Sequence, residues 1–335
     1  MAMRPAITVF LILYMYYCCR IKIQIFTNRI VMDKEFEIKY ETVYTTNNTQ
    51  IISAVDIDKD NNNRIFYSVA RRIYSWNKSD GDMQLVIEAG AKIQSFHHIG
   101  AEKFLIRATS STYVVEKRRN KQKNSSTCIV QVPKLSNCIS RVINNSQSWG
   151  PIAVDYSKPT EVYFETPSVI NKVNLEDSMQ EKPVWQRIFT DSISAMAFDK
   201  DFSALYFMDN EKPTAVSHLD LSTFAFTQVP LHDNVRIDQA VNVFKNTFLC
   251  LTEQSALILL DSNSGRYRHL SLRKSPTAMP CNHSECSREL GIKALASHTT
   301  KYGHLYVLDT NSRILALDYS HIGKKIVWEQ HNTGS

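Results

Sequence analysis

The sequence lacks the short motifs that mark the common enzyme classes. It contains no G-x-S-x-G, no H-E-x-x-H, no C-x-x-C and no glycine loop of the kind that cradles phosphate. The chain therefore lacks the sequence signatures of α/β-hydrolases, zinc proteases, thiol oxidoreductases and nucleotide-binding proteins. A catalytic site assembled in space from distant segments stays open. We therefore expect a non-catalytic protein and keep an enzyme as the alternative.

A long apolar run is also missing. The longest, from Ala6 to Cys19, has 14 residues, whereas a membrane-spanning helix needs about 20. It follows Arg4, which is the order found in secretory signals. We expect residues 1–19 to be a signal peptide and residues 20–335 to form one secreted, extracellular domain without stable membrane insertion. An uncleaved anchor is the alternative, because the small-x-small cleavage pattern is absent.

Cysteine is sparse, and five cysteines remain after the expected signal. In an oxidising compartment we expect disulfide bonds between Cys128 and Cys138 and between Cys281 and Cys286. Zinc is the alternative for such pairs, but neither has the C-x2-C spacing of structural zinc sites. Cys250 lies in the apolar run Phe-Leu-Cys-Leu and is predicted to be a buried, reduced residue.

What the chain does contain is a repeat. Six times a short apolar strand is followed, after a polar turn, by a second strand, and the step from Ala153 to Ala195 is 42 residues. That spacing is typical of one four-stranded propeller blade. The repeats predict an all-β fold, a six-bladed β-propeller of four-stranded antiparallel blades. The strand pairs are 53–58 with 64–68, 93–96 with 103–106, 151–155 with 161–164, 194–199 with 204–208, 239–243 with 247–250, and 293–296 with 303–308.

The two ends of the chain are expected to meet in one blade. The last repeat, from Gly291 to Glu329, has room for about three strands of typical length. A fourth strand must come from elsewhere, and the alternating segment Phe-Glu-Ile-Lys-Tyr opens a strand near the N-terminus. We therefore predict that residues 36–45 complete the last blade and close the ring.

Two repeats are longer than the others. From Ser95 to Ala153 is 58 residues and from Ala240 to Ala294 is 54. These lengths predict surface insertions near residues 117–148 and 273–290, each closed by one of the expected disulfides.

Several Asn residues lie in N-x-[ST] triplets, which are acceptors for N-glycosylation in exported proteins. All of them fall in expected turns or insertions, so we expect a glycoprotein. The acceptors are Asn47, Asn77, Asn124, Asn144 and Asn282.

The chain carries a net charge of +6, much of it in the basic segment 117–123. A cluster of this kind can hold an acidic polysaccharide, and a solvated loop is the alternative. We expect no nucleic acid partner, because no aromatic platform is interleaved with these charges.

Metal-binding patterns are incomplete. Residues 56–60 begin like a calcium loop, but Asn61 stands where glycine is required and Tyr67 where glutamate is required. A tight turn is therefore predicted there. His97 and His98 would point to opposite faces of a strand and could not share a metal.

The segment 191–207 resembles the late-blade segment of the insect Yellow and major royal jelly proteins, in which an apolar strand runs into Leu-Tyr-Phe. The segment 303–322 is similar to that family's closing segment, and 36–40 to its opening Phe-Glu-Trp-Lys-Tyr. The chain departs from the family at Ile38, where the Trp is replaced, and retains only part of the Pro-Pro-Lys-Leu motif at 132–135. A YWTD-like or NHL-like propeller would produce comparable blade strands.

The resemblance implies a secreted propeller whose pocket, at the mouth of the channel, takes small aromatic amines or pigment precursors. Loops that lead into the innermost strands line one mouth of a propeller channel. They would place Phe96, Trp149, Asp191 and Asp238 near one rim. Such a rim suits an aromatic or cationic ligand, and ordinary blade packing is the alternative.

The sequence thus predicts a binding protein for a small molecule, without a cofactor. One alternative is an enzyme like the calcium-dependent lactonase or esterase propellers, which hold a channel cation with Glu, Asn and Asp. Another is an extracellular propeller that binds a protein.

Overall fold

The computed structural model describes residues 36–46, 50–58, 61, 63–100, 102–109, 111–117, 128–129, 138–143, 150–158, 160–166, 169–176, 182–186, 192–199, 201–209, 214–231, 234–275, 290–297, 299–300 and 303–320. Apart from Phe36, these residues belong to one compact unit, Glu37–Ser335. Every regular element among them is a β-strand, which confirms the all-β prediction. In this part of the chain no helix is long and apolar enough to cross a membrane.

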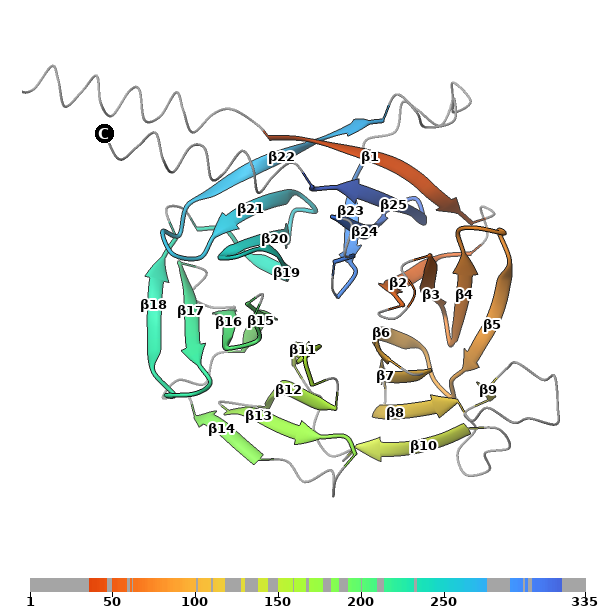
Figure 1. Cartoon of the computed structure of the whole chain (residues 1–335), viewed down its shortest axis with the longest axis horizontal. Helices are drawn as coiled ribbons and strands as arrows, with labels where there is room; N and C mark the ends of the chain where they lie inside the picture. The colour runs from red at the N-terminus through yellow and green to blue at the C-terminus, as the bar shows by residue number, and fades with distance from the viewer. Residues whose placement is uncertain are drawn as a thin grey trace, which may run out of the picture. The chain divides into compact units, whose positions relative to one another are not determined.

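The described strands form six blades around a centre (Figure 1). Blade 1 consists of β2 (Ile52–Ile57), β3 (Arg64–Val69), β4 (Arg72–Asn77) and β5 (Met83–Glu88). Blade 2 consists of β6 (Ile93–Gly100), β7 (Lys103–Ala108), β8 (Thr112–Lys117) and β10 (Cys138–Ile143). Blade 3 consists of β11 (Ile152–Val154), β12 (Glu161–Thr166), β13 (Val169–Asn174) and β14 (Lys182–Gln186).

Blade 4 consists of β15 (Ile193–Phe198), β16 (Ala204–Asp209), β17 (Ala215–Asp220) and β18 (Phe226–Pro230). Blade 5 consists of β19 (Ile237–Phe244), β20 (Thr247–Thr252), β21 (Leu257–Asp261) and β22 (Tyr267–Lys274). Blade 6 consists of β23 (Ile292–Leu295), β24 (His304–Asp309), β25 (Arg313–Asp318) and β1 (Phe36–Thr45). The two strands predicted for each repeat are the two innermost strands of each blade, which confirms the repeat.

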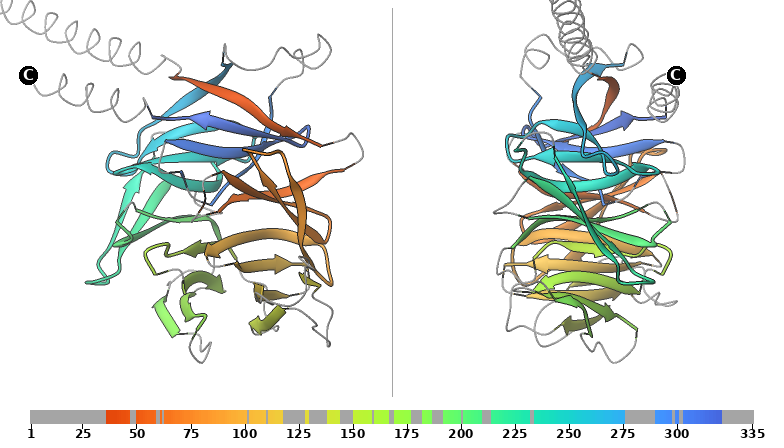
Figure 2. Two further views of the ribbon diagram at one scale, coloured as in Figure 1. Left: turned by 45° about the vertical axis from the view of Figure 1, so that its right-hand side comes forward. Right: turned by 90° about the vertical axis from the view of Figure 1, so that its left-hand side faces the viewer.

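The N-terminal strand closes the ring, as predicted. β1 runs antiparallel to β25, from the pair Lys39 and Asp318 to the pair Thr45 and Arg313. Its other edge lies beside β22, and the Ser275 N–H donates to the Tyr40 carbonyl at 2.8 Å. Blades 5 and 6 are therefore one continuous eight-stranded sheet (Figure 2).

The longer second repeat contributes strands rather than only a surface loop. Within residues 117–148, β10 forms the outermost strand of blade 2. A two-residue strand, β9 (Cys128–Ile129), pairs in parallel with β5 of blade 1. The segment therefore connects two neighbouring blades at their outer edges.

The core lies between the blades, because alternate side chains of every strand face the next blade. Phe66 of blade 1 meets Phe104 of blade 2 edge to face, with ring centroids 4.9 Å apart. Tyr206 of blade 4 meets Phe248 of blade 5 at 4.9 Å. Cys250 is fully buried among the side chains between blades 4 and 5 and carries a free thiol, as expected.

Side chains also tie the innermost strands to neighbouring blades. An innermost strand has no further strand to pair with, so its backbone donors need other acceptors. Asp56 Oδ2 accepts from the His98 N–H at 2.7 Å, and Glu165 Oε1 accepts from the Ile193 N–H at 2.7 Å. Each bond joins two successive blades.

A close approach between blades 4 and 5 requires glycine at residue 265. Gly265 has φ +68°, and a Cβ atom there would lie 1.9 Å from the Pro230 carbonyl oxygen. We expect Gly265→Ala to lower the free energy of unfolding by about 3 kcal/mol, from left-handed strain plus a forced backbone shift.

The matched control is Gly81→Ala, because Gly81 has φ +75° and no atom near the added Cβ. It should cost only the conformational strain, about 1 kcal/mol. Urea unfolding measures both variants, and equal costs would show that the contact with Pro230 is unimportant.

Candidate functional site

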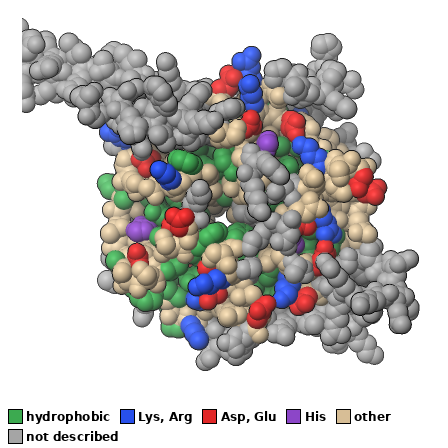
Figure 3. Space-filling view, viewed as in Figure 1, with side chains coloured by type: hydrophobic (Ala, Val, Ile, Leu, Met, Phe, Trp, Pro, Cys, Tyr) green, Lys and Arg blue, Asp and Glu red, His purple; other side chains and the backbone are tan. Residues whose placement is uncertain are grey.

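The centre of the ring contains a cavity of about 1250 Å³. Figure 3 shows the opening at the middle of the ring, with hydrophobic side chains beside it. All six innermost strands line the cavity, and small residues recur at its wall, which leaves the lumen wide. These residues are Ala54, Ala153, Ala195, Ala197, Ala240, Ala294 and Ala296.

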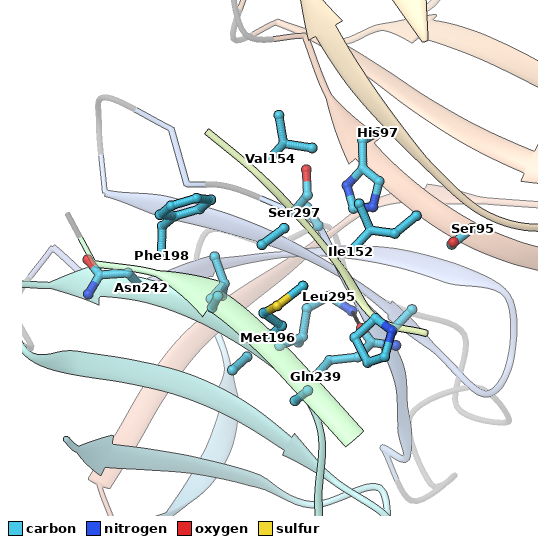
Figure 4. Close-up of a pocket in the computed structure, with 18 of the residues that line it drawn as sticks. Ser95, His97, Ile152, Val154, Met196, Phe198, Gln239, Asn242, Leu295 and Ser297 are labelled. Carbon is cyan, nitrogen blue, oxygen red and sulfur yellow. Dashed lines mark hydrogen bonds between the residues drawn. The ribbon is translucent and has the colours of Figure 1, made fainter. Parts of the chain in front are cut away.

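Several of the larger side chains of the wall are apolar, and polar ones such as Gln239 and Asn242 lie among them. Ile152 and Val154 come from β11, Met196 and Phe198 from β15, and Leu295 from β23 (Figure 4). Such a wall favours the hydrocarbon part of an organic ligand, because burying apolar surface is favourable.

His97 contributes a polar group to the cavity and extends towards Ile152 (Figure 4). In the described part of the chain its Nδ1 atom has no hydrogen-bond partner. Burial lowers the pKa of His97 to about 4, so its imidazole is neutral at pH 7. His98 points the other way and packs against Phe66 and Phe104, which confirms that the two histidines occupy opposite faces.

A hydrogen-bonded bridge crosses the channel. Asp56 Oδ1 accepts from the Ser297 hydroxyl at 2.8 Å, and the Ser297 hydroxyl also contacts the Tyr156 hydroxyl. Tyr156 follows β11 and Ser297 follows β23, so the bridge joins the opposite blades 3 and 6. Burial raises the pKa of Asp56 to about 7, although the hydrogen bonds from His98 and Ser297 oppose this shift.

Two of the four predicted rim residues, Phe96 and Asp238, are described, and both border the cavity. Phe96 is only 3% exposed and packs between blades 1 and 2 in the core, although it also borders the cavity. Asp238 is exposed at the start of β19 and borders the cavity too. Partial burial, with the charge of Glu253, raises its pKa. Trp149 and Asp191 lie outside the described residues.

Most of the residues predicted to form disulfides or to carry glycans also lie outside the described residues. Asn77 is described, and its amide oxygen accepts from the Ser79 hydroxyl at 2.9 Å. Cys128 and Cys138 lie on β9 and β10, but their side chains are not described. Outside the described residues altogether are Asn47, Asn124, Asn144, Asn282, Cys281, Cys286 and the basic segment 118–123.

In the calcium-like segment, Asp56 and Ile57 belong to β2, and residues 59 and 60 lie outside the described residues. The Asp58 carboxylate accepts from the Asn61 N–H at 3.2 Å, and the Asn61 amide oxygen accepts from the Asn63 N–H at 3.1 Å. Within the described residues no three His, Cys, Asp or Glu side chains gather where they could hold a metal ion.

No protein-family model matches the chain, and no curated protein matches its sequence. Solved structures do match it. Virginiamycin B lyase from Staphylococcus aureus, in a catalytically inactive variant with quinupristin, shares 11% identity at a TM-score of 0.55 over 84% of this chain and 99% of that one. A luciferin-regenerating enzyme shares 11% identity at 0.56 over 84% and 95%. The Cps50 (Swd1) propeller domain from Myceliophteria thermophila shares 9% at 0.52 over 82% and 85%.

The fold is a β-propeller. At these identities the likeness extends no further than the fold. The similarity to the Yellow and major royal jelly proteins stays an expectation, because no family match accompanies it.

Sequence reasoning missed the side chains that the fold brings to this propeller's channel. Tyr156 and Ser297 are 141 positions apart, and no short motif joins them. Arg107, another residue of the lining, lies on a second strand rather than an innermost one. The recurring alanines of the innermost strands were the available signal for a wide lumen.

Proposed function

We propose that this protein binds a small organic molecule inside the central channel of the propeller. The observation that supports the proposal is the cavity of about 1250 Å³, whose wall combines apolar and polar side chains. Small-molecule sites are commonly concave, mostly apolar and of roughly 300 to 1000 Å³. The channel is therefore large enough for a ligand with one or two rings.

The proposal keeps the expected extracellular setting, which the signal-like N-terminus and the N-x-[ST] triplets support. Binding of an acidic polysaccharide by segment 117–123 stays a separate prediction. The expectation of an aromatic or cationic ligand relied partly on Trp149 and Asp191, so the charge of the ligand has to be decided from other residues.

Binding inside the channel is tested by filling it. Ile152→Trp adds bulk to the wall, and Ile51→Trp makes the same substitution at a residue that is 70% exposed. Ligands found by thermal-shift screening of aromatic acids, amides and amines, the last including serotonin, dopamine and histamine, should bind Ile152→Trp at least about tenfold more weakly by calorimetry.

The control variant Ile51→Trp should retain the affinity of the wild type. Equal affinity of a ligand for Ile152→Trp and the wild type would place its site outside the channel. Circular dichroism establishes that both variants are folded.

A second candidate is an enzyme, favoured by the neutral imidazole of His97, whose Nδ1 has no partner among the described residues. Such a group can act as a general base. Mass spectrometry of the bound ligand after incubation tests this candidate, since binding alone leaves its mass unchanged. The calcium content of the purified protein tests the lactonase-like alternative.

A further inference from the structure

One part of the cavity wall lies where blades 2 and 3 meet. The innermost strand of blade 3, β11, has only three residues. Gly150 and Pro151, which precede β11, line the cavity together with residues of β6 and β7. We call this part of the cavity the recess.

Three polar side chains share the face of blade 2 that borders this recess. Ser95 is the partner of Arg107 in the register of β6 and β7, and His97 is the partner of Leu105. Directly opposed residues of an antiparallel pair lie on the same face of a sheet. Leu105 packs against Val154 of blade 3, so Ser95, His97 and Arg107 all face blade 3.

Arg107 brings a positive charge to the recess. Its side chain is partly buried and donates to the Gly150 carbonyl at 3.3 Å. In the described part of the chain no carboxylate lies within ion-pair distance of its guanidinium, and burial lowers its pKa. The Glu165 side chain, which also lines the cavity, accepts from the Ile193 N–H at 2.7 Å.

A partly desolvated charge without a counter-ion is unfavourable, and an anion that pairs with it removes that cost. A guanidinium matches a carboxylate particularly well, because two parallel N–H groups can bind its two oxygens. The Ser95 hydroxyl and the neutral His97 imidazole add hydrogen-bonding groups without further charge. The Glu165 carboxylate, which lies beside Gly150, adds a negative charge to the same cavity. A singly charged group therefore suits the recess better than a doubly charged phosphate.

We propose that the ligand of the channel is an organic acid, whose carboxylate binds Arg107 beside Ser95 and His97 while its apolar body lies against Ile152 and Val154. This inference rests on the proposed function. It assigns an acidic ligand to the channel, whereas the rim residues of the sequence analysis suggested a cationic one.

The test compares three probes with one ring system: indole-3-acetate, indole-3-acetamide and tryptamine. Calorimetry on the full chain should show that the acid binds at least about tenfold more tightly than the amide, with the amine weakest. In Arg107→Gln the acid and the amide should bind within about threefold of each other. Arg273→Gln removes an exposed arginine of β22 that pairs with Glu37, and it should leave the preference intact.

Arg107→Lys keeps the charge without the planar fork and should retain part of the preference. If Arg107→Gln does not fold, the lysine variant is used instead. An unchanged preference for the acid over the amide in Arg107→Lys would overturn the inference. The absence of that preference in the wild type would also overturn it. Inorganic phosphate should compete weakly with indole-3-acetate. Stronger competition by phosphate than by acetate would assign the recess to a phosphate group and overturn the carboxylate assignment.

The outcomes separate the two proposals. If the amine or amide binds as tightly as the acid, and Ile152→Trp still weakens binding, the channel is a binding site but the acid assignment is wrong. If no probe or screened ligand is weakened by Ile152→Trp, the channel is not the binding site and both proposals fail.

Discussion

Deletion of residues 1–46 should abolish the cooperative unfolding transition of the propeller. β1 pairs with β25 on one edge and lies beside β22 on the other. Its side chains also reach blade 1, where the Tyr44 ring lies 5.0 Å from that of Tyr67. Without β1, three blades lose contacts at once and two long strand edges become exposed. Urea unfolding followed by tryptophan fluorescence measures the transition.

The matched control for this deletion is a chain that starts at Phe36. It retains all of β1 and should unfold with the same midpoint and slope as the full chain. A synthetic peptide of residues 36–46 should restore cooperativity to the shorter chain, because an open strand edge accepts an added strand. An unchanged transition in the chain without β1 would show that ring closure by the N-terminus contributes little to stability.

The architecture was accessible from the sequence because a propeller repeats itself. Each blade contains one apolar strand, a polar turn and a second apolar strand, and their spacing gives the number of blades. The closing strand followed from counting, since residues 291–329 are too few for four strands. These inferences use only local patterns and lengths, which a single sequence contains.

The site was less accessible, because its groups come from different blades. Arg107 shares its face with Ser95 only through the register of β6 and β7. The bridge from Tyr156 to Asp56 through Ser297 depends on which blades stand opposite each other. Neither relation leaves a motif along the chain.

Phe96 illustrates how the rim prediction depended on the face of a strand. The strand predicted at 93–96 begins at Ile93, as β6 does in the structure. Which face each of its residues occupies follows from the packing of the blades, and the Phe96 side chain faces blade 1. Its neighbours Ser95 and His97 face blade 3 instead.

Substitution of two buried titrating groups should change the pH dependence of stability in opposite directions. The pKa of Asp56 is raised from 3.8 to about 7 by burial. Between these values the native state holds a proton that the unfolded state has lost, so the free energy of unfolding falls as pH rises. The full effect is about 4 kcal/mol.

His97 acts in the reverse sense. Its pKa is lowered from 6.5 to about 4, so between these values the unfolded state holds the additional proton. The free energy of unfolding then rises with pH, by about 3 kcal/mol in full. In the wild type the two contributions oppose each other over nearly the same range of pH, and their sum changes little.

Single substitutions should separate them. Relative to the wild type, His97→Gln should lose stability as pH rises from 4.5 to 6.5, because the contribution of Asp56 is no longer opposed. Asp56→Asn should gain stability over the same range, because the contribution of His97 is left. Urea unfolding at several pH values measures both differences, and groups shared by all three proteins cancel. Differences of the same sign in the two variants would show that burial does not control the titration of these two groups.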